Sequence, residues 1–193
     1  MKKGISLIEA LIAISLLTFS VVGPMSLISK SLAATSYAKD EIMAFYLAHE
    51  ALDVIRNIRD TNLKISAPSW TSITTRTGEV QDLKVVCENG CTFDVWENPP
   101  LLQTTFISGD QYIKQRTCAD GTKLYGYNFG QGSCPRIGPI DPDTIFKREI
   151  YVKDVSSGSF DNEISVTAVV KWKANNGVAR DVVLNENLFK LSF

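Results

Sequence analysis

The sequence predicts an α+β fold in which one long N-terminal helix packs its outer half on an antiparallel β-sheet head. An apolar run begins at Ile5, and no Gly or Pro occurs between Ser26 and Asn62, which favours a long helix. From Ile65 onward apolar residues recur at every second position, as in half-buried antiparallel strands. With 193 residues and 45% hydrophobic content, the chain is long enough for one ordinary domain with an extension.

The apolar run from Ile5 to Ser29 contains no Lys or Arg. As a helix rising about 1.5 Å per residue, it is long enough to cross a bilayer of about 30 Å with some tilt. Lys2 and Lys3 precede it, so the positive-inside rule places the N-terminus in the cytoplasm and residues 31–193 outside. Gly23 and Pro24 predict a kink or local melting near the outer edge, because proline removes a helical hydrogen bond.

Residues 30–62 are expected to continue this helix as an amphipathic segment. At about 100° per residue, apolar side chains between 44 and 58 gather on one half of the helix. Arg59 falls within this half, where it either anchors a group of the head or extends past the helix end, and we favour the second. The apolar half consists of Ala44, Phe45, Leu47, Ala48, Ala51, Leu52, Val54, Ile55 and Ile58.

Three strands are predicted towards the C-terminus. Residues 164–172 alternate between apolar and polar, and 178–184 repeat the pattern after an Asn-Gly turn, which indicates a hairpin. Residues 146–155 form a third strand, and a second hairpin is expected around Asn89-Gly90. The tryptophans Trp70, Trp96 and Trp172 are expected in or beside the core.

The four cysteines lie far from the apolar run and suit an oxidising compartment outside the cytoplasm. Their spacing lacks the paired C-x2-C knuckles of a structural zinc site, so disulfides are favoured over zinc. Of three possible connectivities we favour Cys87 with Cys91 and Cys118 with Cys134, the second bridge closing a long Gly- and Pro-rich surface loop that ends near Thr144.

Composition argues against several functions. The 20 basic and 21 acidic residues leave no electrostatic footprint for nucleic acid. His49 is the only histidine and lies on the polar half of the helix, so no catalytic site and no cofactor are predicted. Asp141 and Asp143 fit a solvated turn better than a calcium site, and no metal ligand is predicted.

Glu9 is the feature that membrane anchoring alone leaves unexplained. A carboxylate inside hydrocarbon is costly and normally has a partner and a role. Gly4 stands five residues before it, and an apolar segment follows that glycine directly.

Three features together resemble the class III signal sequence of type IV pilins, minor pilins and type II secretion pseudopilins. They are the short basic leader Met1-Lys2-Lys3, the Gly4 that follows it, and Glu9 at the fifth position after this glycine. The stretch YLAHEALDVIRNIRDTN also looks like the helix of PilV-like minor pilins. Ile5 and Ser6 replace the residues that are commonest in the family. The resemblance implies a pilin-like fold, cleavage after Gly4 by a prepilin peptidase and methylation of the new amino group on Ile5.

Cleavage would create an ammonium group that a carboxylate can neutralise in lipid. We expect Glu9 to pair with the N-terminus of a neighbouring helix in a filament, which would fix the register of assembly. The implied domains are a leader, 1–4, a membrane or filament-core helix, 5–29, an amphipathic helix, 30–62, and a head, 63–193.

The predicted function is a structural subunit without enzymatic activity, whose partners are the peptidase, other pilin subunits and, before assembly, the membrane. It is expected in the inner or cytoplasmic membrane with its head outside, and in a cell-surface filament after assembly. A pilus, a secretion system and a DNA-uptake apparatus all remain open, as does a secretory signal peptide cleaved before Ala34. The alternative function is a secreted or tethered binding module that uses the loop 118–144.

Overall fold

A computed structural model describes most of the chain, which divides into two compact units, Met1–Ile42 and Met43–Phe193, considered separately below. The predicted leader and the Gly4–Ile5 bond lie outside the described residues, as does Trp96. The described residues are 6–65, 67–74, 79–94, 101–103, 111–127, 129, 134–135, 137–138, 140–155, 162–174 and 177–190.

Helix α1, Leu7–Lys64, is the longest element and belongs to both units. It ends close to the predicted position, residue 62. Its buried residues all come from the predicted apolar half and all lie in the second unit, so the compact head begins within the predicted segment 30–62. These buried residues are Ala44, Leu47, Ala48, Ala51, Leu52, Ile55 and Ile58.

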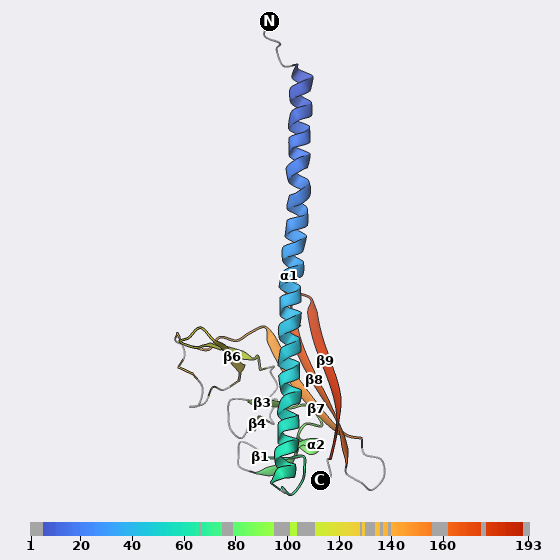
Figure 1. The fold of residues 1–193 in the computed structure, drawn as a ribbon, viewed down its shortest axis with the longest axis vertical. Helices are drawn as coiled ribbons and strands as arrows, with labels where there is room; N and C mark the ends of the chain where they lie inside the picture. Colours follow the sequence, from blue (N-terminus) through green and yellow to red (C-terminus); the bar gives the residue numbers. More distant parts are fainter. Residues whose placement is uncertain are drawn as a thin grey trace. The chain divides into compact units, whose positions relative to one another are not determined.

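The main sheet confirms the three predicted C-terminal strands. The strands are antiparallel in the order β7-β8-β9, and in Figure 1 they lie beside the part of α1 that belongs to the second unit. Gly177, at the predicted Asn-Gly turn, has a φ of 77°, which glycine adopts without steric cost. The strands are β7, Phe146–Asp154, β8, Glu163–Lys173, and β9, Ala179–Phe189.

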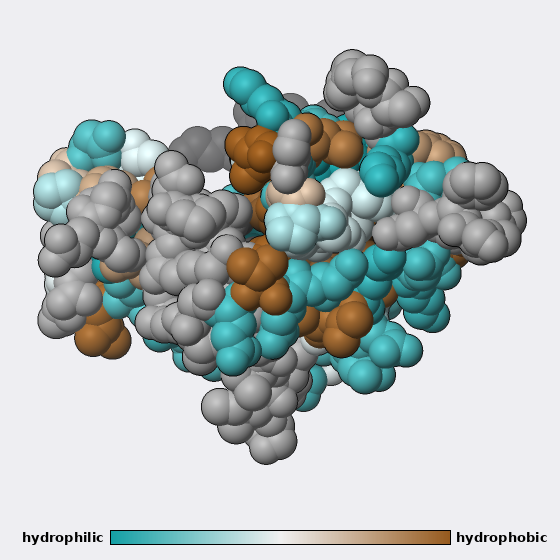
Figure 2. All heavy atoms as spheres, turned by 90° about the horizontal axis from the view of Figure 1, so that it is seen from below, coloured by the Kyte–Doolittle hydropathy of each residue, from teal (hydrophilic) through white to brown (hydrophobic). Residues whose placement is uncertain are grey.

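The core of the second unit lies between α1 and the inner face of this sheet. Alternate residues of β7 and β8, among them Ile150, Val152 and Val166, are fully buried in one cluster with the helix residues. Trp70 and Trp172 are each 4% exposed and belong to this cluster, as predicted. On the face drawn in Figure 2, the described apolar side chains form separate groups among hydrophilic ones.

Smaller elements complete the second unit as two-stranded antiparallel sheets. The pairs are β1, Ser72–Thr74, with β2, Val80–Asp82; β3, Thr92–Asp94, with β4, Leu101–Gln103; and β5, Lys114–Thr117, with β6, Lys123–Gly126.

The predicted hairpin around Asn89-Gly90 is wrong. A short helix, α2, Leu83–Val86, precedes this turn, because the Asp82 carboxylate caps it by accepting a hydrogen bond from the Lys84 amide at 2.8 Å. After the turn, β3 pairs with β4 and not with the segment before it.

The predicted long loop after Cys118 is also partly wrong, since β6 lies within it. Gly121, with a φ of 85°, allows the tight turn from β5 into β6. The Asp120 carboxylate accepts a hydrogen bond from the Thr122 amide, and this bond lowers the pKa of Asp120.

Candidate functional site

In the first unit, the structure places Glu9 in the first turn of α1. Ser6 precedes the helix, and its carbonyl accepts hydrogen bonds from the amides of Glu9 at 3.0 Å and Ala10 at 3.2 Å. Ser6 and Glu9 therefore occupy the N-cap and N3 positions of a capping-box pattern. This spacing offers a local explanation of Glu9, helix capping, beside the intermolecular role that the sequence predicts.

Glu9 is the only ionisable residue among the described residues 6–29. All side chains described from 6 to 39 are exposed, and many of those up to Ile28 are large apolar ones. This stretch of α1 is long and apolar enough to cross a membrane. Its exposed apolar surface is what a lipid or helical partner would cover.

Several hydroxyl groups in this segment donate hydrogen bonds to carbonyls of the helix itself. Ser15 donates to the Leu11 carbonyl at 2.8 Å, and Ser29 donates to the Met25 carbonyl at 3.1 Å. Thr18 makes the same kind of bond within the segment. Hydroxyls bonded in this way need no water, so the segment suits an apolar environment.

Gly23 and Pro24 lie inside α1, whose helical structure continues through them. Pro24 has no amide hydrogen, so one carbonyl of the preceding turn loses its usual helical donor. Ser26 donates to the Gly23 carbonyl at 3.0 Å. The predicted kink or melting at this point stays a prediction.

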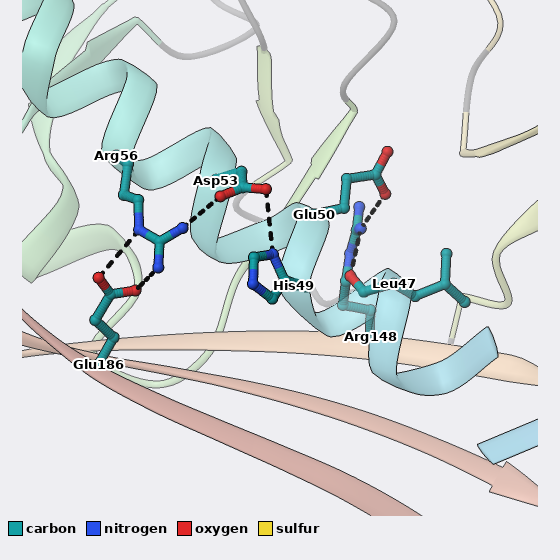
Figure 3. A network of polar contacts seen from close by, with 7 residues as sticks. All are labelled: Leu47, His49, Glu50, Asp53, Arg56, Arg148 and Glu186. Atoms are coloured by element: carbon teal, nitrogen blue, oxygen red, sulfur yellow. Dashed lines mark hydrogen bonds and ion pairs between the residues drawn. The ribbon is translucent and has the colours of Figure 1, made fainter. Parts of the chain in front are cut away.

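In the second unit, α1 and the sheet are joined by ion pairs (Figure 3). Arg148 of β7 points inward among apolar residues, and its side chain is only 1% exposed. Its Nη1 donates to Oε2 of Glu50 at 2.7 Å and to the Leu47 carbonyl at 3.0 Å. A buried charge requires such partners, and here they fix the position of α1 against β7.

A second contact joins α1 to the edge strand β9. Arg56 donates from Nε and Nη2 to both carboxylate oxygens of Glu186, at 3.0 and 2.6 Å. Arg56 also pairs with Asp53, whose Oδ2 lies 3.2 Å from His49 Nδ1 (Figure 3). Hydrogen bonding to Glu186, followed by its charge, raises the pKa of Arg56 above its ordinary value.

The disulfides are the same two pairs that the sequence favours. Cys87 is bonded to Cys91, and both are fully buried. Cys91 exchanges two backbone hydrogen bonds with Ile150, at 2.9 and 2.8 Å, which attaches this short turn to the edge of β7. The bridge therefore holds the turn between Cys87 and Cys91 against β7, at one edge of the main sheet.

The second disulfide, Cys118–Cys134, joins the end of β5 to the segment after β6. Arg116 on β5 is bonded to both carboxylate oxygens of Asp141, at distances of 2.7 to 3.2 Å. The two side chains are 14% and 13% exposed, so Asp141 is not the solvated turn residue that the sequence favours. The bond between Arg116 and Asp141 holds the segment around Asp141 against β5.

Sequence reasoning missed Arg148 and the partner of Arg56. It singled out Arg59 instead, which is paired with the adjacent Asp60 at 2.7 Å. A signal for Arg148 existed, because it alternates in phase with Phe146 and Ile150 and must therefore face the core. The contact between Arg56 and Glu186 links residues 130 positions apart and had no local signal.

None of the family models, curated proteins or solved structures compared with this chain matches it.

Proposed function

We propose that this chain is a structural subunit of a type IV pilus or of a related secretion filament, of the minor pilin or pseudopilin kind. Its apolar helix would hold it in the membrane, with the head outside the cytoplasm, until assembly transfers the helix to a filament core. The observation that carries this proposal is an exposed apolar helical segment with a single carboxylate, Glu9, in its first turn.

Two features of the apolar segment support its burial in lipid or among other helices. The hydroxyls of Ser15, Thr18 and Ser29 donate to backbone carbonyls of the same helix, which lowers the cost of leaving water. The described stretch 6–29 carries no charge besides Glu9, and the next ionisable residue is Lys30. Such a helix has only lipid or other helices to bury its surface.

The proposed role of Glu9 is to pair with the N-terminal ammonium of a neighbouring subunit after cleavage at the Gly4–Ile5 bond. An unpaired carboxylate is costly inside hydrocarbon, so pairing of Glu9 would favour one register between subunits. The competing explanation for Glu9 is the local capping role at N3, which requires no partner chain.

Substitutions at Glu9 separate these two explanations. Glutamine also serves at N3 of a capping box but has no charge, whereas aspartate keeps the charge on a shorter side chain. We expect Glu9→Gln and Glu9→Ala to remain in the membrane but to be lost from sheared filaments, and Glu9→Asp to be retained in part. Recovery in filaments and in washed membranes is measured by quantitative immunoblotting.

Glu41→Gln is the matched control, because it removes an exposed carboxylate of the same unit outside the apolar segment. It should enter filaments as the parent chain does. Equal recovery of Glu9→Gln and the parent chain in filaments would refute the pairing role and leave the capping role.

A further inference from the structure

The outer face of the main sheet carries a cavity of about 690 Å³, at the end where β7 and β9 begin and β8 ends. Its volume is within the range of about 300–1,000 Å³ that is typical of small-ligand sites. Cross-strand neighbours form its floor, since Lys147 lies opposite Lys171, which lies opposite Asp181. Tyr112 belongs to its lining from outside the sheet.

Positive charge is concentrated at this cavity in a chain that is net negative. Four basic residues line it against two acidic ones, whereas the whole chain has 20 basic and 21 acidic residues. The basic residues are Lys147, Lys171, Lys173 and Arg180, and the acidic ones are Glu149 and Asp181.

The pairing of Lys147 with Lys171 is unfavourable for the sheet by itself. Like charges directly opposite each other in neighbouring strands repel and destabilise the pair. Two contacts offset the repulsion: the Lys147 ammonium lies 4.3 Å from the centre of the Tyr112 ring, and Lys171 pairs with Glu149 at 2.7 Å. These contacts hold both ammonium groups at the cavity, where an anion would gain from them.

We propose that this cavity binds an acidic saccharide, a ligand that carries carboxylates and hydroxyls together. The basic side chains would pair with its carboxylates, while Glu149 and Asp181 would accept hydrogen bonds from its hydroxyls. An acidic peptide or a single-stranded DNA would offer these two carboxylates few hydroxyl donors. The proposal concerns the head alone and does not depend on filament assembly.

The test uses the full chain in detergent micelles, with trigalacturonic acid as the probe and calorimetric titration as the measurement. The methyl ester of the same trisaccharide keeps the hydroxyls and removes the charges. Tetraglutamate and a short single-stranded DNA test the other anions. We expect saturable binding of the free acid and at least tenfold weaker binding of the ester and both other probes.

Lys147→Gln and Lys173→Gln should each weaken binding on the order of tenfold, because each removes a charged donor. Lys153→Gln is the matched control, since Lys153 is exposed on the same face of β7 but outside the lining. The melting temperature of Lys147→Gln is measured beside its binding and should change little, because the variant loses the contact with Tyr112 together with the repulsion from Lys171. Reduced binding in that variant would then not reflect unfolding.

Several results would overturn the proposal: no binding of the free acid, equal binding of the ester, equal effects of Lys147→Gln and Lys153→Gln, or tighter binding of tetraglutamate or DNA. Tighter binding of tetraglutamate would identify the cavity as a site for an acidic peptide, and tighter binding of DNA would identify it as a site for a nucleic acid.

Discussion

Arg148 and Glu50 form a 2.7 Å ion pair between the main sheet and α1, in which the arginine side chain is almost wholly buried. Because Arg148 also donates to the Leu47 carbonyl, it binds one particular turn of the helix. A shift of α1 along the sheet would leave this guanidinium without its partners. The pair thus determines which turn of α1 lies against β7.

Removing Glu50 should be costly because it leaves a buried cation without its carboxylate partner. We expect Glu50→Ala to lower the free energy of unfolding by about 3 kcal/mol, and the double variant Glu50→Gln/Arg148→Met to lower it less, since neither charge remains. Urea unfolding of the detergent-solubilised chain measures both values.

Arg56→Ala provides the comparison, because Arg56 and Glu186 are 35% and 28% exposed. Its cost should be about 1 kcal/mol and should shrink at high salt. Equal losses for Glu50→Ala and Arg56→Ala would contradict the distinction between a pair whose arginine is buried and a pair whose arginine is half-exposed.

The Cys118–Cys134 bridge should matter for local order more than for the main sheet. It closes a loop with a sequence separation of 16, for which chain entropy suggests a stabilisation of about 3 kcal/mol. In Cys118→Ala/Cys134→Ala we expect faster amide hydrogen exchange in β5 and β6, with exchange in β8 unchanged. Faster exchange throughout β8 would mean that the bridge supports the whole head.

Alkaline pH should destabilise the head through two tyrosines. Burial raises the pKa of Tyr125, and burial together with the hydrogen bond to Glu149 raises the pKa of Tyr151. The folded state therefore retains these protons, so its stability is fully present below the ordinary pKa of about 10 and declines as the pH rises above it.

Phenylalanine at both positions should make that decline shallower. The measurement is urea unfolding of the parent chain and of Tyr125→Phe/Tyr151→Phe at neutral and alkaline pH. Tyr46→Phe serves as the control, because Tyr46 is 66% exposed. An unchanged dependence of stability on pH in the double variant would exclude the two half-buried tyrosines as its cause.

Local periodicity was sufficient for the long helix and the main sheet. The apolar half of α1 was predictable because its buried residues follow a helical period, and the strand from Glu163 was predictable because its residues alternate. The hairpin predicted around Asn89-Gly90 was wrong because the cap at Asp82 starts a helical turn before it.

The candidate site was predictable only where the signal is local. Glu9 stood out because it is an acid in an apolar run, whereas the bond from Arg56 to Glu186 depends on tertiary packing. The cavity on the outer face likewise appears only once the strands are in register, because Lys147, Lys171 and Asp181 come from three different strands.

The measurement that tests the proposed function most directly is mass spectrometry of the N-terminal peptide of the mature protein from its own cells. The proposal predicts a peptide that begins at N-methylated Ile5. A peptide that begins at Ala34 would contradict it, because the apolar segment would then be a removed signal peptide and Glu9 would be absent from the mature protein.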